Sequence, residues 1–295
     1  MAQNKVFKKD SLEIYKVKKT SKTAKILIHL GLVIWLLIDL FPIYYMLTFS
    51  LKDNEEIFGA NVLGLPKHWL FGNYVEAMSR GNMPRNFLNS IIVSGATIVI
   101  TLIAALMATY ALTRISWKGS KLLNSIFMLG ITIPIHVALY PVYSTFIKLG
   151  MINTAPYSSL IIPYSAFGLS MAIMIATGFM NDIPKELDEA ANIDGCGTWG
   201  IFFRVIVPLM KPALATMGIY TFLQGWNEFM FASIFINDSA HKTLPVGISE
   251  LQGRTTTDWG IVGAGLAIAT LPMLIIYVFL SRRIQESFMV GAVKG

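Results

Sequence analysis

Long apolar stretches separated by short polar ones account for most of the chain. A membrane-spanning helix needs about 20 mainly apolar residues, because the hydrocarbon core of a bilayer is about 30 Å thick. Six stretches meet this requirement: 26–51, 87–112, 122–146, 157–180, 209–236 and 261–281. The pattern predicts an all-α fold, a polytopic membrane protein with six transmembrane helices.

Prolines fall inside several of these stretches. In a soluble helix, an interior proline removes a hydrogen bond and clashes with the preceding turn. Inside a membrane, neighbouring helices satisfy the freed carbonyl groups, so such prolines are tolerated. The positions concerned are Pro42, Pro134, Pro141, Pro163, Pro212 and Pro272.

Composition agrees with a bilayer as the solvent of this chain. Only 14% of its residues are charged, 54% are hydrophobic and the mean hydropathy is +0.59. Soluble domains carry about 25% charged residues, so this chain cannot cover a soluble surface. Its single cysteine, Cys196, excludes an intrachain disulfide and a thiolate metal cluster.

The net charge of +7 is distributed unevenly along the chain. Most of the 24 Lys and Arg residues lie in segment 1–25 or in the loops that follow the second, fourth and sixth stretches. The positive-inside rule therefore places both termini in the cytoplasm. Segment 1–25 directly precedes a span and lacks an aromatic platform, which favours contact with anionic lipid over nucleic-acid binding.

The loop between the fourth and fifth stretches, at about 181–208, contains a short polar helix. Pro184 fits the first turn of this helix, and Gly195 and Gly197 can end it. The helix is too short to span a bilayer and too polar to insert into one. We therefore expect it on the cytoplasmic side.

One face of this short helix is flat and suited to docking. Leu187, Ala190, Ala191 and Asp194 follow helical spacing and share a face. Small side chains there allow a second surface to approach closely, which suggests docking into a groove of a cytoplasmic protein. The residues expected in this contact are Glu186, Leu187, Glu189, Ala190, Ala191, Asp194 and Gly195.

Polar side chains near the outer end of the fifth stretch form a second candidate site. Gln224, Trp226, Asn227 and Glu228 combine an aromatic ring with amides and a carboxylate, which suits a sugar pathway. In the alternative interpretation, Trp226 anchors the helix at the membrane interface, while Asn227 and Glu228 bond to a neighbouring helix or loop. The sequence leaves both interpretations open.

Two further ionisable residues lie within predicted spans. Such residues usually face the bundle interior or a cavity. His136 is interpreted as a donor between helices, and no role is assigned to Asp39. No metal-type pairing such as His-Glu-x-x-His and no phosphate-binding Gly-x-x-x-x-Gly-Lys-Ser/Thr motif occurs in the sequence. We therefore expect no metal site, no ATP site and no enzymatic activity in this chain.

The order of motifs along the chain resembles a known family. Glu189-Ala190-Ala191, Gly195 and Val205-Ile206-Val207-Pro208 resemble the EAA loop of binding-protein-dependent ABC importer permeases. Further motifs resemble the carbohydrate-uptake branch of the maltose and multiple-sugar type. They are Ile133-Pro134, Pro141, Leu149-Gly150, Asn153-Thr154, Ile183-Pro184-Lys185-Glu186-Leu187, Trp226-Asn227-Glu228-Phe229, Thr243-Leu244-Pro245 and the ending Gly291-Ala292-Val293-Lys294-Gly295.

This resemblance implies a function and a set of partners. The chain would be the permease subunit of an ATP-driven importer in a bacterial cell membrane, with residues 26–295 as the six-span domain. A second homologous permease would complete the path, and a cytosolic ATPase dimer would bind ATP and contact the EAA helix. An extracellular solute-binding protein would deliver a sugar or oligosaccharide, with loops 52–86 and 237–260 as its docking surfaces.

The main alternative is a channel or secondary transporter that works without an ATPase. It would account for six spans and for ionisable residues inside the membrane. However, the sequence contains no filter-like run, arginine-rich span or dense carboxylate chain. The channel or transporter alternative also leaves the cytoplasmic helix unexplained.

Overall fold

The computed structural model describes residues 21–80, 82–253 and 255–292, with the side chains of 153 and 280–292 outside the description. Residues 1–20 of the basic segment 1–25 and residues 293–295 of the C-terminal motif 291–295 therefore lie outside the described residues. All regular elements in the described part are helices. The chain forms two compact units that meet between Met46 and Leu47, and each is described by itself.

The first unit consists of helix α1 (Lys22–Phe49) up to Met46. Its apolar side chains are exposed along nearly its whole length, as expected for a helix that contacts lipid. Asp39 is also exposed on this helix.

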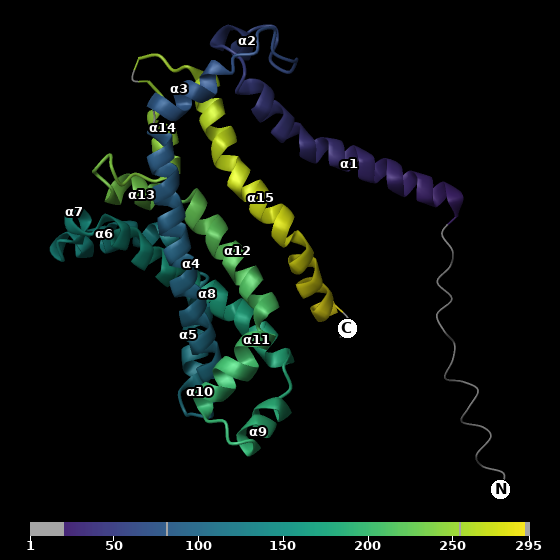
Figure 1. Cartoon of the computed structure of the whole chain (residues 1–295), viewed down its shortest axis with the longest axis vertical. Coiled ribbons are helices and arrows are strands. Elements are labelled where there is room, and N and C mark those ends of the chain that lie inside the picture. Colours follow the sequence, from purple (N-terminus) through teal and green to yellow (C-terminus); the bar gives the residue numbers. More distant parts are fainter. Residues whose placement is uncertain (1–20, 81, 254, 293–295) are drawn as a thin grey trace. The chain divides into compact units, whose positions relative to one another are not determined.

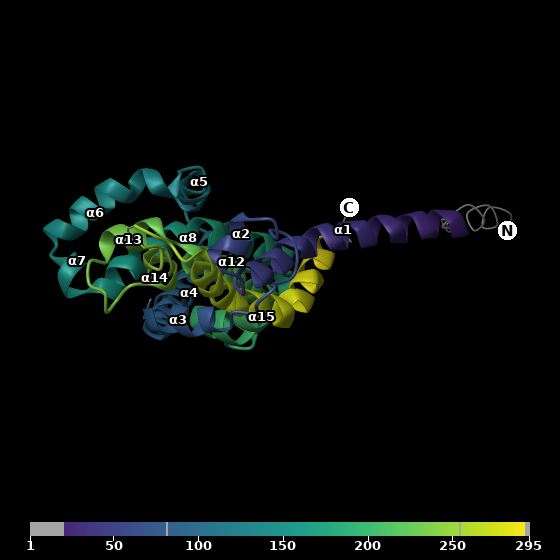
Figure 2. The ribbon, with the colours of Figure 1, turned by 90° about the horizontal axis from the view of Figure 1, so that it is seen from above.

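The second unit is built around four packed helices: α4 (Met83–Thr113), α8 (Pro156–Asp182), α12 (Lys211–Asn227) and α15 (Trp259–Ala292). Helix α4 packs on both α8 and α12, and α15 packs on α12 (Figure 1). Figure 2 shows α5 and α6 lying outside this packed group. Helices α1, α4, α8 and α15 are each long and apolar enough to cross a membrane.

The third and fifth predicted spans are broken rather than continuous. Helix α5 (Ser120–Gly130) is followed by the 3₁₀ helix η1 (Ile135–Ala138) and α6 (Leu139–Lys148), with a bend of 94°. Pro134 stands directly before η1. Since proline cannot continue the hydrogen-bond ladder, the chain breaks there. Six spans result if each bent pair counts as one.

The fifth span is interrupted at both ends. Short helical pieces α10 (Thr198–Ile201), η2 (Phe202–Ile206, a π-helix) and α11 (Val207–Leu209) meet α12 at a bend of 74°. Helix α12 then ends at Asn227, and α13 (Met230–Phe235) begins after a two-residue break. The expectation of one helix over 209–236 is therefore wrong, because breaks at Met210, just before Pro212, and at Glu228 divide it.

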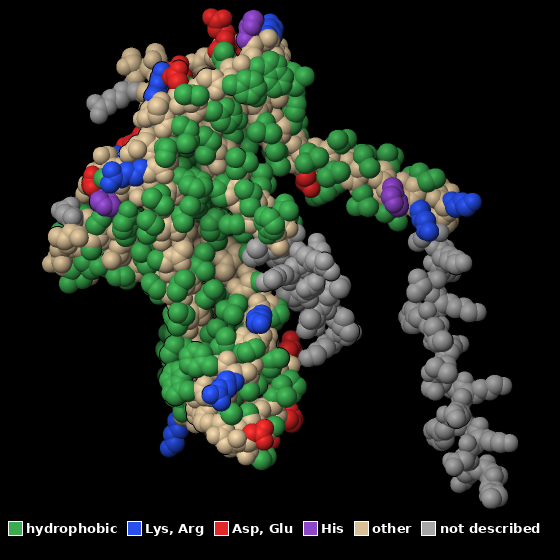
Figure 3. Space-filling view, viewed as in Figure 1, with side chains coloured by type: hydrophobic (Ala, Val, Ile, Leu, Met, Phe, Trp, Pro, Cys, Tyr) green, Lys and Arg blue, Asp and Glu red, His purple; other side chains and the backbone are tan. Residues whose placement is uncertain are grey.

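Short helices lie at the ends of the packed group. Helices α2 (Asn54–Phe58), α3 (Gly72–Arg80) and α14 (Leu244–Glu250) lie at one end, and α9 (Glu186–Ile193) lies at the other (Figure 1). Helix α7 (Met151–Thr154) follows α6. In the space-filling view, charged side chains gather near α2 and α3 and near α9, with apolar side chains between them (Figure 3). This distribution suits a protein that crosses a bilayer.

Candidate functional site

Helix α9 is the short polar helix that the sequence predicts. Glycine ends it as expected, since Gly195 has a φ of +85°, a value that residues with a Cβ rarely adopt. The amide of Asp194 donates to the carbonyl of Ala190 (3.0 Å), and the amide of Cys196 donates to the carbonyl of Ala191 (2.9 Å). These bonds satisfy the last carbonyl groups of the helix.

The residues of the predicted docking face point in two directions. Leu187 and Ala190 are exposed, but Ala191 packs against the cluster of buried side chains in the body of the protein. Glu186, Glu189, Asp194 and Gly195 are also exposed. The expectation of a single flat face that includes Ala191 is therefore corrected, because the helix needs one side for its own packing.

Ile193 is the exposed apolar residue of this helix that sequence reasoning missed. It is 85% exposed and lies three positions after Ala190. A large aliphatic side chain so fully exposed outside the spans is unusual, and exposed apolar groups of this kind often mark contact sites. Its helical spacing from Leu187 and Ala190 was the available signal.

Arg114 ties helix α9 to the membrane-spanning helices. Its side chain is only 4% exposed, and its Nη1 lies 3.2 Å from Asp188 Oδ2. Its Nη2 donates to the carbonyl groups of Met180 and Ile183, both at 2.7 Å. One planar guanidinium thus joins the end of α4 to the end of α8 and to α9, a geometry that a lysine cannot match.

Sequence reasoning alone did not single out Arg114 or Asp188. In the sequence, Arg114 is one of several positive charges in the loop after the second span. Asp188 lies among four acidic residues of one short segment. Only the fold brings the guanidinium and the carboxylate together, since 74 residues separate them.

Trp226 does not provide the exposed ring expected for a sugar pathway. It is 3% exposed, and its Nε1 donates to the carbonyl of Ala269 on α15 (3.1 Å). Phe87 approaches its ring edge-on, with centroids 5.5 Å apart, and Phe222 stacks on it at 5.2 Å. The indole is therefore part of the core between α4, α12 and α15.

Glu228 organises the break between α12 and α13. Its carboxylate accepts hydrogen bonds from the backbone amides of Phe231 (2.9 Å) and Ala232 (3.1 Å) and from the hydroxyl of Tyr164 on α8. A carboxylate here satisfies free amides of the first turn of α13 and suits the positive end of the helix. Glu228 thus anchors α13 against α8.

Gln224 and Asn227 lie on the exposed side of α12. Their amides bond within the same helix, Gln224 Nε2 to the hydroxyl of Tyr220 (2.6 Å) and Asn227 Nδ2 to the carbonyl of Leu223 (2.9 Å). Both residues are exposed, and their spacing with Tyr220 forms a polar stripe along one side of a membrane helix. Such a stripe is costly against lipid, so it fits a water-filled path or a partner helix.

His136 lies in the 3₁₀ break of the third span. It is exposed, and its ring centroid lies 6.5 Å from that of Phe231 on α13. Among the described residues, no group of three or more His, Cys, Asp or Glu side chains is placed to hold a metal ion.

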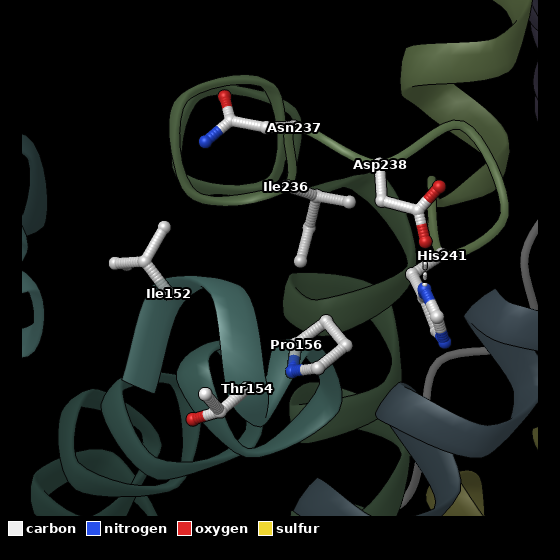
Figure 4. A pocket seen from close by; sticks show the side chains of 7 residues that line it. All are labelled: Ile152, Thr154, Pro156, Ile236, Asn237, Asp238 and His241. Carbon is white, nitrogen blue, oxygen red and sulfur yellow. Dashed lines mark hydrogen bonds and ion pairs between the residues drawn. The ribbon is translucent and has the colours of Figure 1, made fainter. Parts of the chain in front are cut away.

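A hollow of about 480 Å³ lies beside the loop that follows α13. Figure 4 shows Ile152, Thr154 and Pro156 on one side of it and the loop residues Ile236 and Asn237 on the other. Asp238 Oδ1 accepts the amide of Ala240 (3.0 Å), and its Oδ2 lies 2.6 Å from His241 Nδ1. These two bonds hold the pKa of Asp238 below its ordinary value.

The loop between α1 and α3 is ordered by a buried lysine and a buried glutamate. Lys52 is 1% exposed and its Nζ donates to the carbonyl groups of Asn61 (2.7 Å) and Val62 (3.1 Å). Glu56 accepts from Asn61 Nδ2 (2.7 Å) and from the amide of Lys67 (3.1 Å). Burial alone would raise the pKa of Glu56, but these hydrogen bonds outweigh it and the pKa lies below its ordinary value.

The broken spans, the exposed polar stripe and the short helix at one end are features of a protein that crosses a membrane. Comparison with known proteins identifies its family. Residues 97–289 match the family described as "Binding-protein-dependent transport system inner membrane component". The chain belongs to this family of ABC transporter permeases. It is therefore a multi-pass membrane protein.

Individual relatives are similar over most of their length. The probable ABC transporter permease protein YurM of Bacillus subtilis (strain 168) is 36% identical, with 90% of this chain and 87% of the relative aligned. The trehalose/maltose transport system permease protein MalG of Thermococcus litoralis is 34% identical, over 92% and 97% of the two chains. A crystal structure of a bacterial ABC transporter for the acidic polysaccharide alginate shares the fold, with a TM-score of 0.77 at 20% identity over 89% and 98% of the chains.

Proposed function

We propose that this permease forms, with a second homologous permease, the translocation path of an ATP-driven importer for a sugar or oligosaccharide. The observation that carries the proposal is helix α9, an exposed acidic and apolar helix fixed by Arg114 to the ends of α4 and α8. A helix so anchored transmits the movement of a docked ATPase directly to two spans. The names of relatives support the substrate class, since they include trehalose/maltose and diacetylchitobiose uptake permeases.

The proposal assigns each partner to a surface. A cytosolic ATPase dimer contacts Leu187, Ala190 and Ile193, and holds the ATP, so this chain itself is not an enzyme. An extracellular solute-binding protein contacts the opposite end, around α2, α3 and the loop after α13. Support for that partner comes from a structural neighbour that matches this chain with a TM-score of 0.62. That transporter was solved in complex with a periplasmic protein that holds an alginate pentasaccharide.

The stripe of Tyr220, Gln224 and Asn227 faces the path or the second permease in this proposal. Trp226 and Glu228, by contrast, act through the fold, since their polar atoms bond to α15, α8 and α13. Both termini lie in the cytoplasm, as the distribution of Lys and Arg predicts.

The first experiment is purification from native membranes with the C-terminus left free, followed by identification of the proteins that purify with the chain. Recovery of a second six-span permease and an ATPase supports the proposal.

The double variant Glu189→Lys with Gly195→Trp should lose the ATPase and still insert into the membrane. Recovery of the chain alone as a stable homo-oligomer contradicts the proposal and favours a channel or secondary transporter. The ligand of the companion solute-binding protein then tests the substrate class.

A further inference from the structure

A very small cavity lies where the two broken spans meet. Its volume is about 20 Å³. Ile135 contributes from η1, at the break of the third span, and Glu228 contributes from the break of the fifth. The other lining residues are Thr97, Tyr164, Thr221, Gln224 and Gly225. Three helices, α4, α8 and α12, therefore converge on a space that is lined largely by polar residues.

Two hydroxyl groups in this cavity are deeply buried and have no hydrogen-bond partner. Thr97 is 1% exposed and Thr221 is 2% exposed, and neither Oγ1 atom is bonded. Buried polar groups in folded proteins are nearly always satisfied, either by protein or by ordered water. Because these two side chains, from different helices, also line one cavity, they point to a small polar ligand in that cavity.

The available donors and acceptors specify that ligand. The two threonine hydroxyls each have a proton to donate, and the carboxylate of Glu228 keeps accepting capacity beyond its three bonds. Gln224 uses its Nε2 for Tyr220, which leaves its carbonyl oxygen as an acceptor. A water molecule accepts two hydrogen bonds and donates two, and it needs about 10–15 Å³. A cation would leave both hydroxyl protons without an acceptor.

We propose that this cavity binds one structural water molecule, which accepts from Thr97 and Thr221 and donates to Glu228 and Gln224. The water joins α4 to α12 beside the break that leads into α13. It thereby holds the hinge of the fifth span against the centre of the bundle. This inference goes beyond the transport function, since it does not depend on which solute is carried.

Valine variants distinguish a cavity that binds water from one in which the two hydroxyls simply lack a hydrogen-bond partner. Removing an unsatisfied buried hydroxyl is neutral or stabilising, whereas removing a partner of a bound water is destabilising. We expect Thr97→Val and Thr221→Val each to lower the thermal midpoint of the purified permease complex by about 2–4 °C. Because both hydroxyls share one water, the double variant should fall no further than the larger single effect.

Thr109→Val is the matched control, since Thr109 also lies on α4, is fully buried and has an unpartnered Oγ1, but does not line the cavity. Its midpoint should stay unchanged or rise. The same result for Thr97→Val and Thr221→Val, or strictly additive losses, would overturn the proposal.

A density map of the wild-type complex at high resolution provides a second measurement that does not depend on folding of the variants. A single peak about 2.5–3.0 Å from both hydroxyl oxygens is expected for water. An empty cavity, a solute hydroxyl in its place, or a peak with uniformly shorter contacts typical of a metal ion would overturn the proposal.

Discussion

Arg114 shows how much a single buried side chain contributes to the arrangement of this permease. A guanidinium that is almost fully buried must find acceptors for its donors, and here they are a carboxylate and two carbonyl groups at helix ends. Glu228 plays the corresponding part at the break of the fifth span. Both residues connect elements that are distant in the sequence, so their loss should affect movement between elements as well as stability.

Replacing Arg114 should uncouple the ATPase from transport. In Arg114→Gln the carboxylate of Asp188 stays in place without its cation, at a cost of about 3 kcal/mol, and α9 loses its link to α4. We expect several-fold lower substrate-stimulated ATP hydrolysis in reconstituted vesicles. Arg114→Lys should be intermediate, because an ammonium group cannot reach all three acceptors at once.

Lys118 provides the control for this measurement. It is also a cation in the segment that follows α4, but it is exposed. Exposed charges contribute little, about 0–1 kcal/mol. Lys118→Gln should therefore hydrolyse ATP as the wild type does. Wild-type stimulation in Arg114→Gln would contradict the coupling role of Arg114.

Removing the carboxylate of Glu228 should loosen the hinge between α12 and α13. Glu228→Ala leaves two backbone amides and the Tyr164 hydroxyl without their acceptor. Loss of a comparable helix cap costs about 1 kcal/mol, which corresponds to a thermal midpoint lower by about 2–4 °C. Asn227→Ala, which loses only a bond to its own helix, should change the midpoint less. Equal midpoints for both variants would show that Glu228 does not anchor the hinge.

The loop ordered by Glu56 should depend on pH. The pKa of Glu56 in the folded protein lies below its ordinary value of 4.5. Its contribution to stability is therefore complete above about pH 4.5 and is lost as the pH falls through the lowered pKa. We expect protease cleavage within residues 52–71 to increase below this range.

Variants of the two neighbouring glutamates test this assignment. Glu56→Gln should be cleaved more readily at neutral pH and should show a smaller increase in acid. Glu55→Gln, in which an adjacent exposed carboxylate is neutralised, should behave as the wild type. An identical acid response in all three proteins would assign the pH dependence to other groups.

At the scale of elements, the short helix α9 depends on how it ends. Gly195 adopts a φ of +85° with open space around its Cα, so a substitution there meets backbone strain rather than a clash. The helix then presents Leu187, Ala190 and Ile193 outward and keeps Ala191 and Asp188 for the body. The two sides of one eight-residue helix thus have separate tasks, docking and anchoring.

Gly195→Ala should weaken attachment of the ATPase without affecting membrane insertion. A residue with a Cβ in the left-handed conformation costs about 1–2 kcal/mol, which is enough to alter the end of so short a helix. We expect less ATPase to be recovered with the purified variant. Gly197→Ala is the control, because its surroundings are open and its φ is −73°. Equal recovery with both variants would contradict this role of Gly195.

For the whole molecule, the proposed orientation sets which end meets which compartment. The only cysteine is first replaced by Cys196→Ser. In this background, Asn192→Cys and Ser79→Cys each place a single thiol at an exposed position, one at each end of the packed helices. We expect a membrane-impermeant maleimide to label Ser79→Cys in intact cells and Asn192→Cys only in inverted vesicles. The reverse pattern would invert the topology, and labelling of both in intact cells would contradict a bilayer between them.

The sequence determined the class of fold, the approximate positions of the spans and the short helix of the loop 181–208. These features follow from local patterns, namely apolar length, proline and glycine positions and the distribution of charge, which do not need tertiary contacts. The tertiary structure decided what the patterns left open. In the structure the third and fifth predicted spans break at Pro134 and Glu228, Trp226 is buried against α15, and Arg114 pairs with Asp188. The physical reason is that a polar or aromatic side chain has several possible partners, and only the packing of distant helices selects one.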